Sequence, residues 1–320
     1  MSSRRERHST AAATIVEAGT QSGTAAIQSV PAECVLLATN GSAEANAALR
    51  FASAYAAREE LLLRILTVLE PLPMLPAQPS GITYAMTIER ERGDAILAGV
   101  RAQLAALGTA PRSLTTMLVG GPGATIADAA REWNAQYIVV GAGRRGTVER
   151  LLSGDTVARI LRRAAAPVIA VPSTAGELPS VGVVGVDFGV ASLTAVRRAA
   201  SLLGEGVLHL LHIRPEFDIP ATDPDSWGEI YQLGAAALMT KLTTDLETEF
   251  PGLRVETAFD RGHASTILLA YADRVHADLI AVGQHGHGVV DRFLFGSVAQ
   301  EMVRSAKCAV VVTPPARESE

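Results

Sequence analysis

One block of sequence occurs twice in this chain, and the repetition constrains the fold more than any other feature. The copy in the second half covers 277–314, ADLIAVGQHGHGVVDRFLFGSVAQEMVRSAKCAVVVTP. It begins with a short apolar run typical of a buried strand, continues through a glycine-rich loop and a helical pattern, and ends in a second apolar run. The copy in the first half covers 135–172, AQYIVVGAGRRGTVERLLSGDTVARILRRAAAPVIAVP, and keeps this order with altered loop residues.

The repetition extends to whole domains. Residues at the turns recur 141 to 147 positions apart: Asn40 with Asp187, Gly121 with Gly262, Gly141 with Gly283, and Gly154 with Gly296. In each half five apolar runs alternate with helical patterns, which predicts an α/β fold of two tandem open-sheet sandwiches, each a five-stranded parallel sheet flanked by helices. We expect domains at 32–173 and 181–314, a linker at 174–180, a flexible tail at 1–31 and a short tail at 315–320.

The apolar runs and helical patterns give approximate bounds for the elements. We expect strands at 34–38, 61–69, 113–119, 168–171, 181–186, 207–213, 253–259, 279–282 and 309–313, and one more at the start of the block 135–172. We expect helices at 43–57, 85–107, 125–133 and 227–250, and helix starts near 192 and 265. Ser42 is expected to cap the first helix, with Glu44 in its first turn.

Composition and charge argue against several classes of protein. A net charge of −5 with scattered arginines gives no reason to expect a nucleic-acid partner. No apolar run approaches the roughly 18 residues of a membrane helix. The first thirty residues lack the hydrophobic stretch of a signal peptide. The two cysteines, Cys34 and Cys308, form no disulfide framework and are expected to be buried, which favours a reducing, cytoplasmic compartment.

The glycines of the second copy suggest a phosphate-binding loop. Gly283 ends a strand, Gly286 follows in the loop, and Gly296 and Ser297 stand at a helix start. Glycine lets the backbone approach an anion, and a helix N-terminus presents unpaired N–H groups at the positive end of its dipole. A glycine-rich loop with no ligand explains the same spacing equally well.

Two residues at other strand ends would complete a nucleotide site. Asp187 ends the first strand of the second half, where a carboxylate could accept a hydrogen bond from a ribose hydroxyl or a base amino group. Ile213 ends the second strand, where it could form an apolar wall for a flat base. Parallel sheets place ligands at this carboxyl edge.

With these motifs, the two halves resemble tandem universal stress protein domains over 32–173 and 180–314. ATP-binding members of that family carry the pattern G-2x-G-9x-G-(S/T), which the second half matches at every defined position. By this resemblance the second domain binds ATP, with Mg²⁺ accompanying the phosphates, through residues of the strand ends and the last helix: Asp187, Ile213 (after His212), Val282, Gly283, Gly286, Gly296, Ser297, Val298 and Ala299.

The first half departs from the pattern where the ligand would lie. Asn40 replaces the aspartate, Arg144 replaces the second glycine, and Asp155 replaces the serine or threonine. We therefore expect an impaired or empty counterpart site, although Arg144 and Arg145 could instead pair with an anion. The remaining members of this degenerate counterpart are Val68, Gly141 and Gly154.

Two other patterns invite different functions. Residues 141–146 spell G-x-G-x-x-G, but the next strand ends in Pro172 without the acidic residue that a dinucleotide site requires. His285 and His287 flank a glycine, yet two loop histidines are not a metal-ligand set, so we expect no metal-ligating residues and interpret the two histidines as solvated loop residues.

The resemblance also predicts how the domains assemble and what they do. Universal stress protein domains dimerise through their last strand, so 168–171 and 309–313 are expected to pair within the chain, and two chains could associate further into a homodimer. The implied function is nucleotide-dependent stress adaptation or signalling with an unknown signalling partner. No catalytic group is identifiable, so a slow ATPase and a nucleotide-independent interaction module remain the alternatives.

Overall fold

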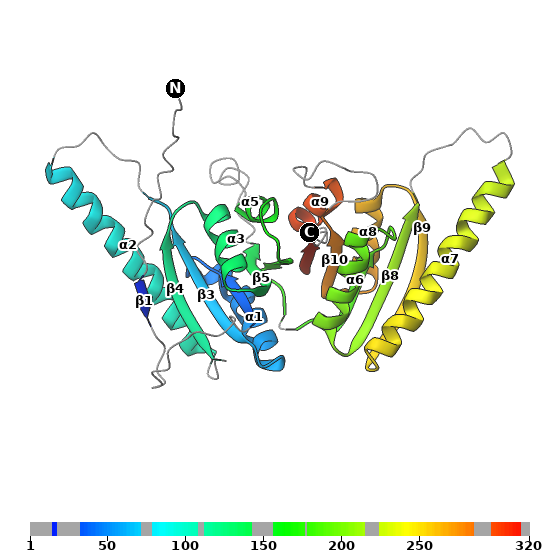
Figure 1. Ribbon diagram of the computed structural model, residues 1–320, viewed down its shortest axis with the longest axis horizontal. Helices are drawn as coiled ribbons and strands as arrows, with labels where there is room; N and C mark the ends of the chain where they lie inside the picture. Colours follow the sequence, from blue (N-terminus) through cyan, green and yellow to red (C-terminus); the bar gives the residue numbers. More distant parts are fainter. Residues whose placement is uncertain are drawn as a thin grey trace, which may run out of the picture.

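One continuous sheet crosses the whole molecule (Figure 1). The structure, a computed structural model, describes residues 15–17, 33–71, 79–107, 112–142, 156–176, 178–214, 224–284 and 296–314. Its eleven described strands lie in the order β1-β4-β3-β2-β5-β6-β11-β10-β7-β8-β9. Their bounds are β1 Ile15–Glu17, β2 Cys34–Ala38, β3 Leu62–Leu69, β4 Ser113–Val119, β5 Ala135–Ala142, β6 Val168–Pro172, β7 Val181–Gly185, β8 Gly206–Arg214, β9 Leu253–Arg261, β10 Leu279–Gly283 and β11 Ala309–Thr313.

The helices cover both faces of this sheet. They are η1 Ala43–Ala45, α1 Asn46–Arg58, α2 Pro79–Ala106, α3 Pro122–Glu132, α5 Thr156–Leu161, α6 Val190–Leu203, α7 Pro224–Glu249, α8 Ala264–Arg274 and α9 Ser297–Ser305. One apolar core lies between the sheet and α1, α2, α6 and α7, and the other lies between the sheet and α3, α5, α8 and α9. Figure 1 shows α2 and α7 at opposite ends of the molecule.

Each half contributes five parallel strands. In the first half β2 pairs with β3 and β5, β3 with β4, and β5 with β6. In the second half β7 pairs with β8 and β10, β8 with β9, and β10 with β11. The predicted α/β fold of two tandem parallel sheets is therefore confirmed.

The two halves join through their last strands. β6 and β11 pair antiparallel, with Val310 opposite Ala170 and Val312 opposite Val168. All five residues of each strand are buried, so neither leaves an exposed apolar edge. The predicted pairing of these strands within the chain is confirmed. Both apolar cores continue across this seam, so the domains share their interior.

Side chains of α1 reinforce the seam by capping α6 of the other half. The guanidinium of Arg58 donates hydrogen bonds to the backbone oxygens of Ser201 at 2.7 Å and Leu202 at 2.9 Å. A helix leaves its last carbonyl groups without intrahelical donors, and a cation there also complements the helix dipole. The first domain thus supplies the C-terminal cap of the second domain's α6.

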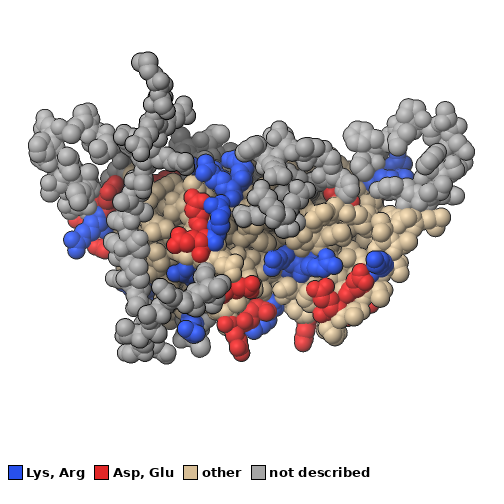
Figure 2. All heavy atoms as spheres, in the orientation of Figure 1, with Lys and Arg blue, Asp and Glu red and all other residues tan. Residues whose placement is uncertain are grey.

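Some local expectations need correction. Ser42 occupies the position before the first helix but makes no side-chain capping hydrogen bond, because the chain enters through the 3₁₀ turn η1. Within the expected N-terminal tail, β1 adds an antiparallel strand to β4, and the sequence analysis did not predict it. No helix in the described part of the chain is long and apolar enough to cross a membrane. Figure 2 shows acidic and basic side chains interspersed on one face.

Candidate functional site

The predicted ligand site of the second domain lies at the carboxyl edge of its sheet. β7 pairs with both β8 and β10, so the ends of these three strands are neighbours. Asp187 lies just beyond β7, Ile213 near the end of β8, and Gly283 at the end of β10. α9 starts at Ser297 and packs against β10 and β11. The fold therefore gathers strand ends and a helix start that are far apart in the sequence.

Asp187 forms a tight turn into α6. Its carboxylate oxygen Oδ1 accepts a hydrogen bond from the Gly189 amide at 2.9 Å, and the hydroxyl of Ser192 donates to the Gly189 carbonyl at 3.0 Å. In the first domain Asn40 makes the same kind of turn, with Oδ1 accepting from the Ser42 amide at 3.1 Å. Asparagine thus preserves the local geometry of the turn while removing the negative charge.

Gly283 is required by the packing of α6. A Cβ atom built on Gly283 would lie 2.8 Å from the Cβ and 3.0 Å from the carbonyl carbon of Ala191 in the first turn of that helix. The buried hydroxyl of Thr313, at the end of β11, donates to the Ala191 carbonyl at 2.9 Å. From the sequence we expected this glycine to let the backbone approach a phosphate. The described contacts show that its lack of a side chain makes room for the first turn of α6.

The first domain lacks both of these constraints. A Cβ atom on Gly141 would be 3.5 Å from the nearest atom of the described residues, the Cα of Ala45, which is an ordinary contact. Pro172 ends β6 as Thr313 ends β11, and proline has no hydroxyl group to donate. The carboxyl edge of the second domain is therefore held more tightly than its counterpart.

The N-terminus of α9 offers backbone donors to a ligand. The Gly296 amide donates to the Gln284 carbonyl at 3.0 Å, and the Gln300 amide makes the first helical bond, to the Gly296 carbonyl at 3.0 Å. The amides of Ser297 and Val298 lie in the first turn, where N–H groups have no intrahelical acceptor. Among the described residues no side chain caps this end, and Ser297 is exposed. These features suit an anion.

The apolar members of the predicted site are partly core residues. Val282 is 4% exposed and Ala299 is 1% exposed, so their side chains pack in the interior. Ile213 and Val298 are half-buried on the same core face. Ile213 is thus placed to present an apolar surface at the edge, whereas Val282 and Ala299 offer mainly backbone.

His212 supports this edge from the other face of the sheet. Its Nδ1 atom lies 2.7 Å from the Val186 carbonyl oxygen, so Nδ1 carries the proton and donates it. The ring packs at 4.9 Å, centroid to centroid, against Phe188, whose φ of 60° is unusual for an aromatic residue. Sequence reasoning used His212 only to locate Ile213, and the alternation of side chains along a strand was the signal that it faces the opposite way.

Several predicted residues lie outside the described part of the chain. These are Gly286 and the loop histidines of the second domain, and Arg144, Arg145, Gly154 and Asp155 of the first. Asn40, Val68 and Gly141 are described, and all three lie at the carboxyl edge of the first domain's sheet. Val68 is half-buried, as is Ile213, which likewise lies near the end of the second strand of its own half.

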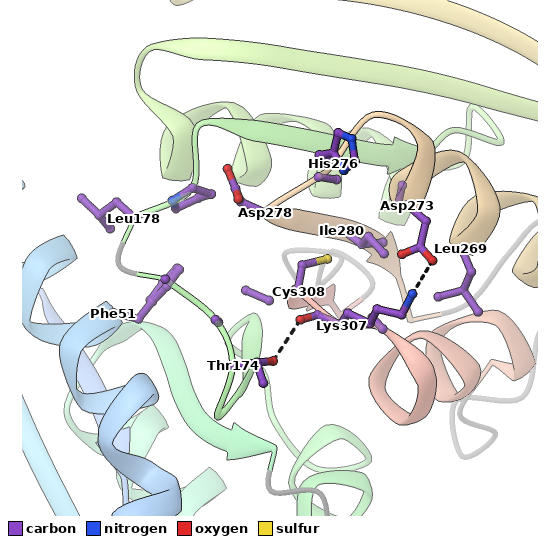
Figure 3. A pocket seen from close by; sticks show the side chains of 17 residues that line it. Phe51, Thr174, Leu178, Leu269, Asp273, His276, Asp278, Ile280, Lys307 and Cys308 are labelled. Atoms are coloured by element: carbon purple, nitrogen blue, oxygen red, sulfur yellow. Dashed lines mark hydrogen bonds and ion pairs between the residues drawn. The ribbon is translucent and has the colours of Figure 1, made fainter.

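A cavity of about 300 Å³ lies away from the candidate site (Figure 3). It is bounded by the linker, Phe51 of α1, the end of α8 and the start of β11. Lys307 pairs with Asp273 at 2.6 Å, and the Thr174 hydroxyl donates to the Lys307 carbonyl at 3.4 Å. Burial raises the pKa of the Cys308 thiol to about 12, so this wall carries a protonated thiol. The cavity opens at the amino ends of β10 and β11, opposite the carboxyl edge.

A second cavity, of about 510 Å³, lies between β8, β9 and α7. His212, Arg214 and Phe259 contribute to its wall. These residues point to the α7 face of the sheet, whereas Ile213 points to the α8 face. This cavity is therefore separate from the predicted nucleotide site, although both lie near the end of β8.

The fold and the edge described above define a class of protein, a tandem α/β open-sheet protein whose halves pair through their last strands. The model of the universal stress protein family matches residues 33–172 and 183–314. The chain therefore belongs to the universal stress protein family.

Similar proteins match nearly the whole chain. A universal stress protein of Mycolicibacterium smegmatis is 28% identical over 301 residues, which cover 90% of this chain and 99% of that protein. One of Mycobacterium tuberculosis is 24% identical over 287 residues, covering 87% and 96% respectively. These relatives thus share the tandem length.

A solved structure shows the same tandem fold. A universal stress protein from Archaeoglobus fulgidus aligns with a TM-score of 0.61 and 19% identity, covering 89% of this chain and 97% of that one. A universal stress protein solved in complex with cAMP covers 44% of this chain and all of its own, with 23% identity and a TM-score of 0.34.

Proposed function

We propose that the second domain binds ATP at its carboxyl edge and that the protein acts in nucleotide-dependent stress adaptation or signalling. The observation that carries the proposal is the start of α9 at Gly296 and Ser297, beside the ends of β10 and β11. Its first-turn amides and an exposed serine hydroxyl are donors suited to phosphate oxygens. Membership of a family in which some proteins bind nucleotides supports the proposal.

The described residues suit the parts of this ligand. The α9 N-terminus and Ser297 would hold phosphate groups, with Mg²⁺ neutralising part of their charge. Asp187, one strand away, would accept a hydrogen bond from a ribose hydroxyl or a base amino group. Ile213 would pack against the base. ATP would supply a phosphate chain that these residues hold, and we assign none of them a catalytic role.

The asymmetry of the halves supports one main site per chain. Asn40 keeps the turn of Asp187 without its charge. Arg144 and Asp155 in the sequence of the first domain would add a bulky cation and a carboxylate where the second domain has Gly286 and Ser297. A carboxylate beside phosphate is repelled, so the first domain is proposed to bind ATP weakly or not at all.

The compartment and the partners belong to the same proposal. Cys34 is buried as expected, whereas Cys308 is only partly buried; both are free thiols, which supports the proposal of a reducing, cytoplasmic compartment. The seam between β6 and β11 is satisfied within one chain, so association of two chains into a homodimer would use another surface. The signalling partner is expected to distinguish the ATP-loaded from the ATP-free protein.

The test compares nucleotide binding before and after the second domain is given the first domain's residues. Nucleotide that copurifies with the protein is identified by mass spectrometry, and ATP affinity is measured by calorimetry. We expect the Gly286→Arg/Ser297→Asp variant to lose at least tenfold in affinity. Gly234→Arg is the matched control, because it adds the same cation to the same domain where a Cβ meets no atom within 4 Å.

Two outcomes would contradict the proposal. If the wild-type protein carries no nucleotide and does not bind ATP at millimolar concentration, the function is wrong. If the double variant binds ATP as tightly as the Gly234→Arg control, the site lies elsewhere. Release of phosphate during prolonged incubation would show that ATP is also hydrolysed.

A further inference from the structure

The residue after Gly283 connects the candidate site to the other domain. Gln284 is 6% exposed, and its side-chain amide Nε2 donates a hydrogen bond to the Leu161 carbonyl oxygen at 3.1 Å. Leu161 is the last residue of α5 in the first domain, and α5 is the helix that follows that domain's degenerate glycine loop. The bond is buried and joins residues 123 positions apart.

The carbonyl group of Leu161 needs a donor from outside its helix. Terminal carbonyls of a helix have no intrahelical partner. The next backbone donors do not supply one, because the amides of Arg163 and Ala164 both bond to the Ile160 carbonyl, at 2.9 and 2.8 Å. The amide of Gln284 therefore caps α5 from across the seam. A buried amide and carbonyl paired in this way are costly to separate.

The backbone of Gln284 also holds the candidate site together. Its N–H donates to the Thr313 carbonyl at 2.8 Å, and its own carbonyl accepts the bond from the Gly296 amide at 3.0 Å. One residue thus links the ends of β10 and β11, the N-terminus of α9 and, through its side chain, α5 of the other domain. Movement of the α9 N-terminus would be transmitted through this residue.

Only one of the two equivalent positions, Gln284 and Ala142, carries a side chain that can make this bond. Ala142 follows Gly141 as Gln284 follows Gly283, and alanine has no side-chain donor. Ala142 therefore cannot make the equivalent side-chain bond to a helix of the second domain. The one-sided bond originates in the domain that keeps the intact glycine pattern.

We propose that Gln284 is a positioning residue that couples the α9 N-terminus of the second domain to α5 of the first, so that a ligand at the intact site alters the order of the degenerate domain. The part that concerns the ligand rests on the proposed ATP site. The mechanical coupling itself is a property of the ligand-free protein.

Gln284→Met tests the coupling, because methionine keeps the length of an unbranched side chain and removes the donor. Gln300→Met is the matched control, because Gln300 is exposed on α9 and its backbone bond to Gly296 is retained. Hydrogen exchange of the ligand-free proteins is followed in peptides that cover 156–164 and 296–302. We expect about three- to tenfold faster exchange in both segments for Gln284→Met. Unchanged exchange in 156–164, or equal effects of the two variants, would overturn the coupling.

Addition of ATP separates this proposal from the proposed function. With coupling, ATP slows exchange in 156–164 of the wild-type protein and of Gln300→Met, and this effect is lost in Gln284→Met even when ATP is raised to saturation. If calorimetry shows ATP binding and 156–164 does not respond in the wild-type protein, signalling between the domains is refuted while the site stands. If ATP does not bind, the proposed function fails, and the ligand-free comparison still decides the coupling.

Discussion

Replacing Gly283 at the end of β10 with alanine should destabilise the protein, whereas the same change at Gly141, near the end of β5, should not. Gly283→Ala would place a Cβ atom 2.8 Å from the Ala191 Cβ and 3.1 Å from the Ser192 backbone nitrogen. Those atoms belong to the first turn of α6, which Thr313 and the Asp187 turn hold in place. The helix start would have to shift, and such overpacking costs about 1–3 kcal/mol. We expect the free energy of unfolding to fall by about 2 kcal/mol.

Gly141→Ala is the control that the duplication supplies. Its Cβ atom would make only an ordinary contact at 3.5 Å with Ala45. Alanine also lowers the conformational entropy of the unfolded chain, which stabilises by about 0.4–1 kcal/mol where the backbone permits it. We therefore expect Gly141→Ala to be neutral or slightly stabilising, so the two variants should differ by roughly 2–3 kcal/mol.

Urea unfolding followed by circular dichroism measures this difference. Because both apolar cores cross the seam, we expect the domains to unfold together, with similar slopes for wild type and variants. The midpoint should fall for Gly283→Ala and stay or rise for Gly141→Ala. Equal destabilisation by both variants would refute the claim that the second domain's edge is packed more tightly.

Two further predictions concern the seam and the two thiols. Arg58→Ala should lower the free energy of unfolding in urea by about 1–2 kcal/mol, because α6 carbonyls lose a charged donor. The Arg58 side chain is 29% exposed, so solvent screening keeps this loss modest. Arg131→Ala, which removes an exposed helix ion pair, should change stability by less than about 0.5 kcal/mol, and equal effects would contradict the capping role. Burial raises the pKa of Cys34 to about 11 and of Cys308 to about 12 from an ordinary 9.0. The unfolded chain therefore loses its thiol protons at a lower pH than the folded chain does. The stability that these protonated thiols contribute is complete below pH 9 and is lost as the pH rises toward 11–12. Over that range the urea midpoint of a Cys34→Ala/Cys308→Ala variant should fall less steeply than that of the wild-type protein. An unchanged decline would show that the thiols do not contribute.

The strands were the most predictable part of the fold. The expected bounds 34–38, 113–119 and 309–313 match β2, β4 and β11, because buried apolar runs end where polar or glycine residues begin. Helix starts were less predictable. α2 and α7 begin at Pro79 and Pro224, earlier than expected. Proline is compatible with a first helical turn, but it adds nothing to the apolar periodicity from which a helix is recognised. β1 has only three residues, too few for a pattern.

The candidate site was predictable as an arrangement and not in its contacts. The order of the strands places Asp187, Ile213 and Gly283 at one edge, and the duplication identifies the copy that keeps the glycine pattern. The contact of Gly283 with Ala191 depends on how closely α6 approaches β10, which no sequence spacing encodes. The bond from Gln284 to Leu161 depends on the seam between the halves, and its sequence signal was a glutamine where the other copy has alanine.

The number of ATP molecules bound per chain tests the central claim most directly. The ligand-free tandem protein is titrated with ATP and Mg²⁺, and the stoichiometry is obtained by calorimetry and checked by equilibrium dialysis. An intact second site beside a degenerate first site predicts one ATP per chain, lost in the Gly286→Arg/Ser297→Asp variant. Two equivalent sites per chain, or one that survives in that variant, would contradict the account.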